Sequence, residues 1–272
     1  MPIPRLSLAQ LTIDPVSING LIAAAAGAGF DAINPRVRAV ADKGPSVIPV
    51  RDMKQRLDDS GLSVLALTSF WIMPDTNPED IESIADAAAA FGAPFIQSVI
   101  NDEDEGRALS NFSRACEIAA GRGRTLAIEF LGYVAVPSLA ATASFIKASG
   151  QRNAGVCLDA LALARADETP ADVAALDPKL ISYVQICDGL RKSPPRDQLR
   201  NEARALRLYP GEGELPIAGL LDALPQDIPI DVEAPVAADA ALSPESKAKK
   251  AADKTRSFLQ SYRRQKSPET RK

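Results

Sequence analysis

The feature of the sequence that most constrains its fold is a regular alternation of short apolar runs with longer segments of helical pattern. Short apolar runs separated by helices are typical of a parallel sheet wrapped by helices. Helices are expected at residues 17–28, 78–91, 105–121 and 138–149, among others. Eight strand cores are expected, at residues 6–11, 32–34, 63–68, 95–99, 125–130, 155–159, 181–186 and 230–233.

The length of the chain and the order of these units favour one closed barrel. A chain of 272 residues has the usual size of a single (β/α)8 barrel. No G-x-G-x-x-G motif follows the first expected strand, which argues against a Rossmann fold. We therefore predict an α/β fold, a (β/α)8 TIM barrel, with one domain at residues 1–262 and a charged C-terminal tail at residues 263–272.

The sequence contains no histidine, and this absence excludes several classes of enzyme. Zinc hydrolases, and serine or cysteine hydrolases with a histidine base, need an imidazole near neutral pH. The net charge of −4 argues against nucleic acid as a partner. The N-terminus lacks a signal-peptide pattern and no apolar stretch reaches the length of a membrane span, so we expect no membrane partner and a cytoplasmic location. Cys116, Cys157 and Cys187 are odd in number and widely spaced, which predicts buried thiols without disulfides.

Polar residues end four consecutive strands that are otherwise apolar. They are Glu129 in LAIEF, Asp159 in GVCLDA, Gln185 in YVQICD and Glu233 in IDVEAP. In a barrel the carboxyl ends of the strands meet at one mouth, so these side chains are expected to lie together. Three buried carboxylates without a counter-charge would be very costly, and a divalent cation would remove that cost.

The donor set of the expected site is made of oxygen atoms. Such donors favour Mn²⁺ or Mg²⁺ over zinc or copper, and we expect Mn²⁺, with Mg²⁺ or Co²⁺ as substitutes. The alternative is that the acids form ordinary ion pairs with arginine side chains such as Arg165 or Arg207.

The motifs IEF, LDALALAR, QICDG and RLYPGEGEL together resemble the sugar phosphate isomerase/epimerase superfamily. This superfamily consists of xylose isomerase-like barrels and includes tagatose epimerases and inosose dehydratases. The resemblance covers most of the chain, from RLSLAQLT to DVEAP. It implies a metal held by a glutamate, an aspartate, a histidine or glutamine, and a second glutamate. The matching residues are Glu129, Asp159, Gln185 and Glu233.

The sequence departs from the family pattern at Ala162. Many members have a histidine three residues after the aspartate ligand, where this chain has Ala162. A contact to the substrate that is usually made by that histidine is therefore missing. The glutamine at Gln185 most resembles inosose dehydratase and its relatives.

The resemblance implies that Glu129 and Glu233 act as acid and base on opposite sides of the substrate. An isomerase or epimerase of a sugar or sugar-like hydroxy ketone, working through an enediolate, is the leading hypothesis. A lyase or dehydratase acting on a polyol ketone, keto-glycoside or dehydroshikimate-like acid is the alternative, and a barrel without catalysis that serves as a binding or accessory subunit is a third. The expected partner is a small sugar or polyol, and the sequence leaves a homo-oligomer open.

Five further residues are candidate substrate contacts. Arg207 and Asp188 follow the seventh expected strand, and Arg165 follows the strand of Asp159. Arg207 would offer a planar fork to a hydroxyl, carboxylate or phosphate, or would stiffen its loop through an ion pair. Asp188 would orient Gln185 or cap a loop. Phe70 and Trp71, in LTSFWIMPD, would form an apolar wall or an ordinary core pair.

Overall fold

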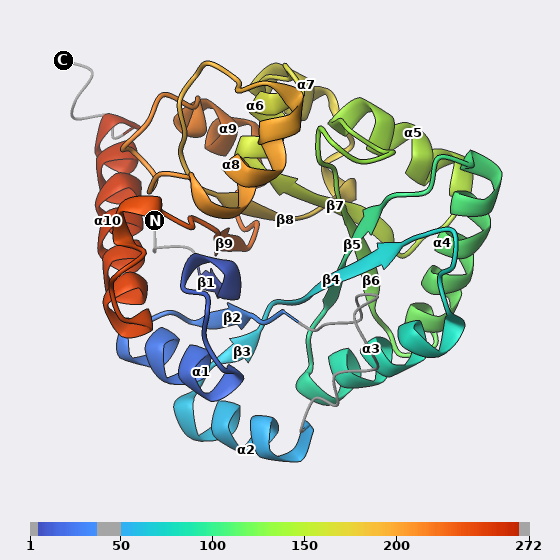
Figure 1. Cartoon of the computed structure of the whole chain (residues 1–272), viewed down its shortest axis with the longest axis horizontal. Helices are drawn as coiled ribbons and strands as arrows, with labels where there is room; N and C mark the ends of the chain where they lie inside the picture. The colour runs from blue at the N-terminus through green and yellow to red at the C-terminus, as the bar shows by residue number, and fades with distance from the viewer. Residues whose placement is uncertain (1–4, 37–49, 267–272) are drawn as a thin grey trace.

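The computed structural model describes residues 5–36 and 50–266. Within these residues, nine parallel strands form one nearly closed barrel with helices around its outside (Figure 1). The predicted TIM barrel is confirmed. The strands are β1 (Leu6–Ala9), β2 (Ala32–Asn34), β3 (Ser63–Val64), β4 (Ala66–Ile72), β5 (Phe95–Ile100), β6 (Thr125–Glu129), β7 (Ala154–Asp159), β8 (Ile181–Ile186) and β9 (Ile230–Val232).

The helices follow the strands in the expected order. Longer ones are α1 (Ile18–Gly27), α2 (Val50–Ser60), α3 (Pro78–Phe91), α4 (Glu105–Ala120), α5 (Leu139–Ser149) and α10 (Pro244–Lys266). Shorter ones are α6 (Ala160–Arg165), α7 (Pro170–Ala175), α8 (Leu199–Ala205) and α9 (Ile217–Ala223). Short 3-10 turns are η1 (Gln10–Thr12), η2 (Pro178–Leu180), η3 (Arg196–Gln198) and η4 (Ala237–Asp239). The last helix, α10, packs beside the first helix, α1, so the helices that surround the barrel begin and end side by side (Figure 1).

The third expected strand differs most from the prediction. It is divided into β3 and β4, with only Leu65 between them, and β4 continues to Ile72. β3 pairs with β2 and β4 pairs with β5, so this bent segment joins the two edges of the sheet. The Leu65 N–H donates to the carbonyl of Ile33 at 2.9 Å, which keeps the bend bonded to β2. Phe70 and Trp71, which the sequence placed after the third strand, therefore belong to β4.

The first strand is shorter than predicted, because Gln10–Thr12 forms η1. Thr12 Oγ1 donates to the carbonyl of Val232 at 2.9 Å and accepts from the Ala234 N–H at 3.0 Å. The turn therefore ties the end of β1 to the end of β9. At the other end of the chain, α10 continues to Lys266, so its last turn includes residues that the sequence placed in the charged tail.

The apolar core has three parts, of which the smallest consists of Val99, Leu131 and Val134. The largest part fills the space between the outer faces of the strands and the helices. The second part joins side chains of the neighbouring strands β6, β7 and β8 with others from β2 and the β3–β4 segment, and contacts between strands that are not neighbours are made across the barrel interior. Its buried members are Ala32, Leu65, Ala66, Ala127, Cys157 and Tyr183. The three cysteines are buried and free, as predicted.

In the part of the chain that the structure describes, no helix combines the length and apolar character needed to cross a membrane.

The first turn of α5 provides a test of how this sequence begins a helix. Ser138 Oγ accepts from the Ala141 N–H at 3.1 Å, and the Glu168 carboxylate accepts from the two preceding N–H groups. Ser138→Ala removes only the first bond, so we expect the free energy of unfolding to fall by about 1 kcal/mol. Ser144→Ala, in the exposed middle of the same helix, is the matched control and should cause no loss. Urea denaturation measures both, and equal effects would contradict the capping role.

Candidate metal centre

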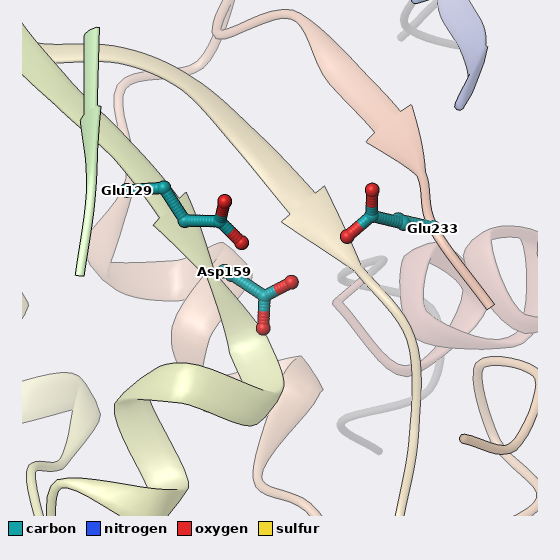
Figure 2. A group of neighbouring side chains, drawn as sticks. All are labelled: Glu129, Asp159 and Glu233. Atoms are coloured by element: carbon teal, nitrogen blue, oxygen red, sulfur yellow. The ribbon is translucent and has the colours of Figure 1, made fainter. Parts of the chain in front are cut away.

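Three carboxylates converge at the carboxyl end of the barrel. Glu129 ends β6, Asp159 ends β7, and Glu233 follows β9. One oxygen from each lies within 4.8 Å of the others, and Figure 2 shows the three side chains turned toward one another. All three are buried. The structure therefore brings together the acidic residues that the strand-end pattern singled out.

Asp159 is fixed from two sides. It is the N-cap of α6, and its Oδ1 accepts from the Ala162 N–H at 2.8 Å. Its Oδ2 accepts from Arg207 Nη1 at 2.5 Å. Because β7 passes directly into α6, the side chain that ends the strand also begins the helix.

Arg207 is the cation beside the carboxylates. Its guanidinium is buried and donates from Nη1 to Asp159 and from Nη2 to Glu233 Oε2 at 3.0 Å. Its Nε donates to the carbonyl of Ala203 at 2.7 Å, which anchors the side chain against α8. Three carboxylates facing one guanidinium leave two formal negative charges, which one divalent cation would balance.

Burial and mutual repulsion make the two glutamates weak acids. Burial raises the pKa of Glu129 to about 7, with a further increase from Asp159, while Arg207 and Gln97 oppose the shift. Burial also raises the pKa of Glu233 to about 8, against the opposing charge of Arg207. Carboxylates in this state gain from any added positive charge.

Gln185 lies on β8, where it is in register with Asp159 on β7 and with Asp231 on β9. Its Nε2 donates to Asp231 Oδ2 at 3.1 Å, and its Oε1 accepts from the Cys157 thiol at 3.2 Å. A thiol is a weak donor, so the amide oxygen of Gln185 remains a suitable oxygen ligand. The sequence did not single out Asp231, which fixes the orientation of this amide.

Gln97 is a further site residue that the sequence analysis missed. Its Nε2 donates to Glu129 Oε2 at 2.6 Å, and its Oε1 accepts from Tyr183 at 2.6 Å and from Thr68 at 3.1 Å. The two hydroxyl donors fix the amide so that its NH2 group faces Glu129. A polar residue inside the apolar strand FIQSVI is the same anomaly that identified the four strand-end residues.

A cavity of about 630 Å³ opens above the carboxylates. Glu129, Glu233 and Arg207 line it, whereas Asp159 is not among the described lining residues. Phe70 and Trp71, for which the sequence left open an apolar wall or an ordinary core pair, are among its lining residues. This volume is that of a pocket for a small organic molecule.

Arg165, an expected substrate contact, has another partner. Arg165 forms a bidentate ion pair with Glu202, at 2.6 and 2.7 Å, and is not among the described residues that line the cavity. Its guanidinium is thus held between α6 and α8. Ala162, at the position of the missing histidine, is buried in the first turn of α6.

Asp188 organises a loop. Its Oδ1 accepts from the N–H groups of Gly189 and Leu215, and its Oδ2 accepts from the Gly211 N–H at 3.0 Å. A Cβ at Gly213 would lie 2.5 Å from Asp188 Oδ1, so the glycine-rich segment packs directly on this carboxylate. Asp188 therefore caps the loop. Of its two predicted roles, orienting Gln185 or capping a loop, these bonds correspond to the second.

Comparison with known proteins agrees with this architecture. A family model described as xylose isomerase-like TIM barrel matches residues 22–261. No curated protein matches the chain significantly.

Several solved structures share the fold. The IolI protein, in a structure with a binding zinc atom, is 16% identical with a TM-score of 0.78, covering 95% of this chain and 99% of that chain. An L-ribulose 3-epimerase is 16% identical with a TM-score of 0.75, covering 97% of both chains. The D-allulose 3-epimerase from Methylomonas sp., in complex with D-allulose, is 18% identical with a TM-score of 0.72, covering 95% of this chain and 97% of that chain.

The raised pKa values predict how the stability of chelator-treated protein depends on pH. The pKa values of Glu129 and Glu233 in the folded protein, about 7 and about 8, lie above the ordinary value of 4.5. Between these values the folded state binds more protons than the unfolded chain, so the free energy of unfolding falls as the pH rises from about 4.5 to about 8. Glu233→Gln should flatten this decrease, as measured by thermal unfolding across the range.

Glu103→Gln, at an exposed position away from the cavity, is the control and should keep the wild-type slope. An equal slope in wild type and Glu233→Gln would contradict the assignment of the titration to this centre.

Proposed function

The chain belongs to the xylose isomerase-like TIM barrel family, and on this basis we propose that it is a divalent-metal-dependent isomerase or epimerase of a sugar or sugar-like hydroxy ketone. The observation that carries the proposal is that two buried glutamates with raised pKa values line one cavity. Their strands, β6 and β9, are separated in the sheet by β7 and β8, so they reach the cavity from different sides of the mouth. Asp159 lies between them in the strand order.

The donor set fits a divalent cation. Glu129, Asp159 and Glu233 would hold it, with the amide oxygen of Gln185 as a fourth ligand. Oxygen donors favour Mn²⁺, with Mg²⁺ or Co²⁺ as alternatives, although the similar IolI structure has zinc. When bound, such a cation supplies a Lewis acid that polarises a carbonyl and stabilises negative charge on its oxygen.

The two glutamates are suited to move a proton. One oxygen of each is anchored, because Glu129 Oε2 accepts from Gln97 and Glu233 Oε2 accepts from Arg207. In the metal-free protein, with pKa values of about 7 and about 8, the pair can hold one carboxylate and one carboxylic acid near neutral pH, and a bound cation would lower both pKa values.

The carboxylate removes the proton from the carbon beside the substrate carbonyl, and the C–H electron pair passes to the carbonyl to form an enediolate. The other glutamate then returns a proton to carbon. Return to the opposite face of the same carbon gives epimerisation. Return to the neighbouring carbon, with the hydroxyl proton passing to the former carbonyl oxygen, gives aldose–ketose isomerisation.

The first test of this function is metal binding. We expect purified protein to bind about one Mn²⁺ or similar ion per chain, because the carboxylates exceed the single guanidinium in charge. Glu129→Ala and Asp159→Ala should weaken binding by at least about tenfold in calorimetry of chelated protein, while exposed Glu103→Ala should not. Unchanged affinity in both site variants would remove the basis of the proposal.

The second test separates a base from a ligand. Glu233→Gln keeps the volume and one oxygen donor of the side chain, but an amide accepts no proton. We expect kcat to fall by about a hundredfold or more, with a smaller change in substrate binding. Deuterium exchange at carbon and product formation by NMR, on a ketose panel that includes allulose and ribulose, measure the effect.

Gln185→Ala is the contrasting variant. It removes a neutral donor, so its main effect should be weaker metal affinity that excess Mn²⁺ restores. Rescue of Glu233→Gln by excess metal would show that Glu233 is only a ligand.

A further inference from the structure

One wall of the cavity carries two arginines that the reaction described above does not use. Arg200 and Arg204 lie on α8, both are exposed, and both line the cavity that contains Glu129 and Glu233. Residues four apart on a helix share one face, so the two guanidinium groups project from the same side of α8. We call them the arginine pair.

Within the described residues no ion pair joins the arginine pair to an acid, and this includes Asp75 and Asp80, which line the same cavity. Glu202, on the same helix, is held by Arg165 in a bidentate ion pair. Glu233 is engaged by Arg207. Considering residues 5–36 and 50–266, no hydrogen bond or ion pair is found for the side chains of the arginine pair.

Like charges four residues apart destabilise a helix slightly. The arrangement therefore has a small cost to the fold, and no contact within the described residues offsets it.

Tyr133 connects the arginine pair to the reacting end of the cavity. It is half-buried and lines the same space. Burial raises its pKa, Glu129 adds to the increase, and Arg207 and the arginine pair oppose it. One phenol therefore lies within electrostatic range of both Glu129 and the arginine pair. The glutamates and these guanidinium groups line one cavity of about 630 Å³, which is the volume of a pocket for a small organic ligand.

We propose that the substrate carries an anionic group, a phosphate monoester or a carboxylate, and that Arg200 and Arg204 bind this group at the end of the cavity away from the reacting carbons. The inference rests on the proposed function for the reaction at the other end. Guanidinium groups match the oxygen geometry of both anions, and a group bound by two of them would orient the carbon chain toward the glutamates. A neutral sugar would leave the positive charge of these two arginines without an opposite charge.

Calorimetry of metal-loaded protein with three related ketoses tests the inference. D-fructose is neutral, D-fructuronate carries a carboxylate, and D-fructose 6-phosphate carries a phosphate. We expect at least one anionic ketose to bind about tenfold or more tightly than D-fructose, because charge-assisted bonds are added. The better of the two anions identifies the group, and its affinity should fall as the salt concentration rises.

The variants locate the contact. Arg200→Gln with Arg204→Gln should weaken binding of the preferred anionic ketose by about tenfold or more and leave that of D-fructose unchanged. Arg191→Gln with Arg196→Gln removes the same charge from exposed residues that are not among the described lining of the cavity, and is the matched control.

The inference is overturned if neither anionic ketose binds more tightly than D-fructose, including the case in which none of the three binds. It is also overturned if the control pair causes the same loss as the arginine pair. Failure of the proposed function has a separate signature, since it appears as absent metal binding or absent deuterium exchange. Calorimetry measures binding of the ketose, so a loss of catalysis does not change the outcome. The titration is repeated on chelated protein, in which turnover makes no contribution to the heat.

Discussion

The confinement of three carboxylates at one end of the barrel is the constraint on which the rest of the site depends. Like charges within 4.8 Å repel strongly once they are removed from water. Arg207 relieves part of this repulsion, because its planar group reaches Asp159 and Glu233 together. Burial, together with the remaining negative charge, raises the pKa values of the glutamates, and that charge favours a divalent cation. The burial of like charges thus accounts for the expected metal affinity and for the acid–base character of the pair.

The carboxylates are supported from below by polar side chains inside the barrel. Asn34 donates to Asp231 at 2.8 Å, Thr68 and Tyr183 donate to Gln97, and Asp231 accepts from Gln185. Each of these side chains is buried, so an unpaired partner would be costly. The bonds fix the two amides that flank the carboxylates. Orientation at the cavity is therefore determined by strands on several sides of the barrel.

The strand ends were the most predictable part of the site. Glu129, Asp159 and Glu233 interrupt or end apolar runs, and parallel strands in a barrel bring such ends to one mouth. The sequence allowed Arg207 to pair either with the strand-end acids or with an acid of its own loop, and only the structure shows that Asp159 and Glu233 are its partners. Glu202, close to Arg207 in sequence, pairs with Arg165 instead. Ion-pair partners depend on distances in space, which spacing along a chain does not give.

The sequence by itself determined the parallel barrel, the helix starts and the residues at the strand ends, because each depends on local periodicity or on one fixed rule of barrel geometry. Only the tertiary structure decided which donors meet which acceptors. Gln97 faces Glu129, Asp188 holds its loop, and Arg200 and Arg204 face the cavity, because strands and helices far apart in the chain pack around one mouth. The residue types were visible in the sequence, but their directions follow from packing that couples the whole barrel.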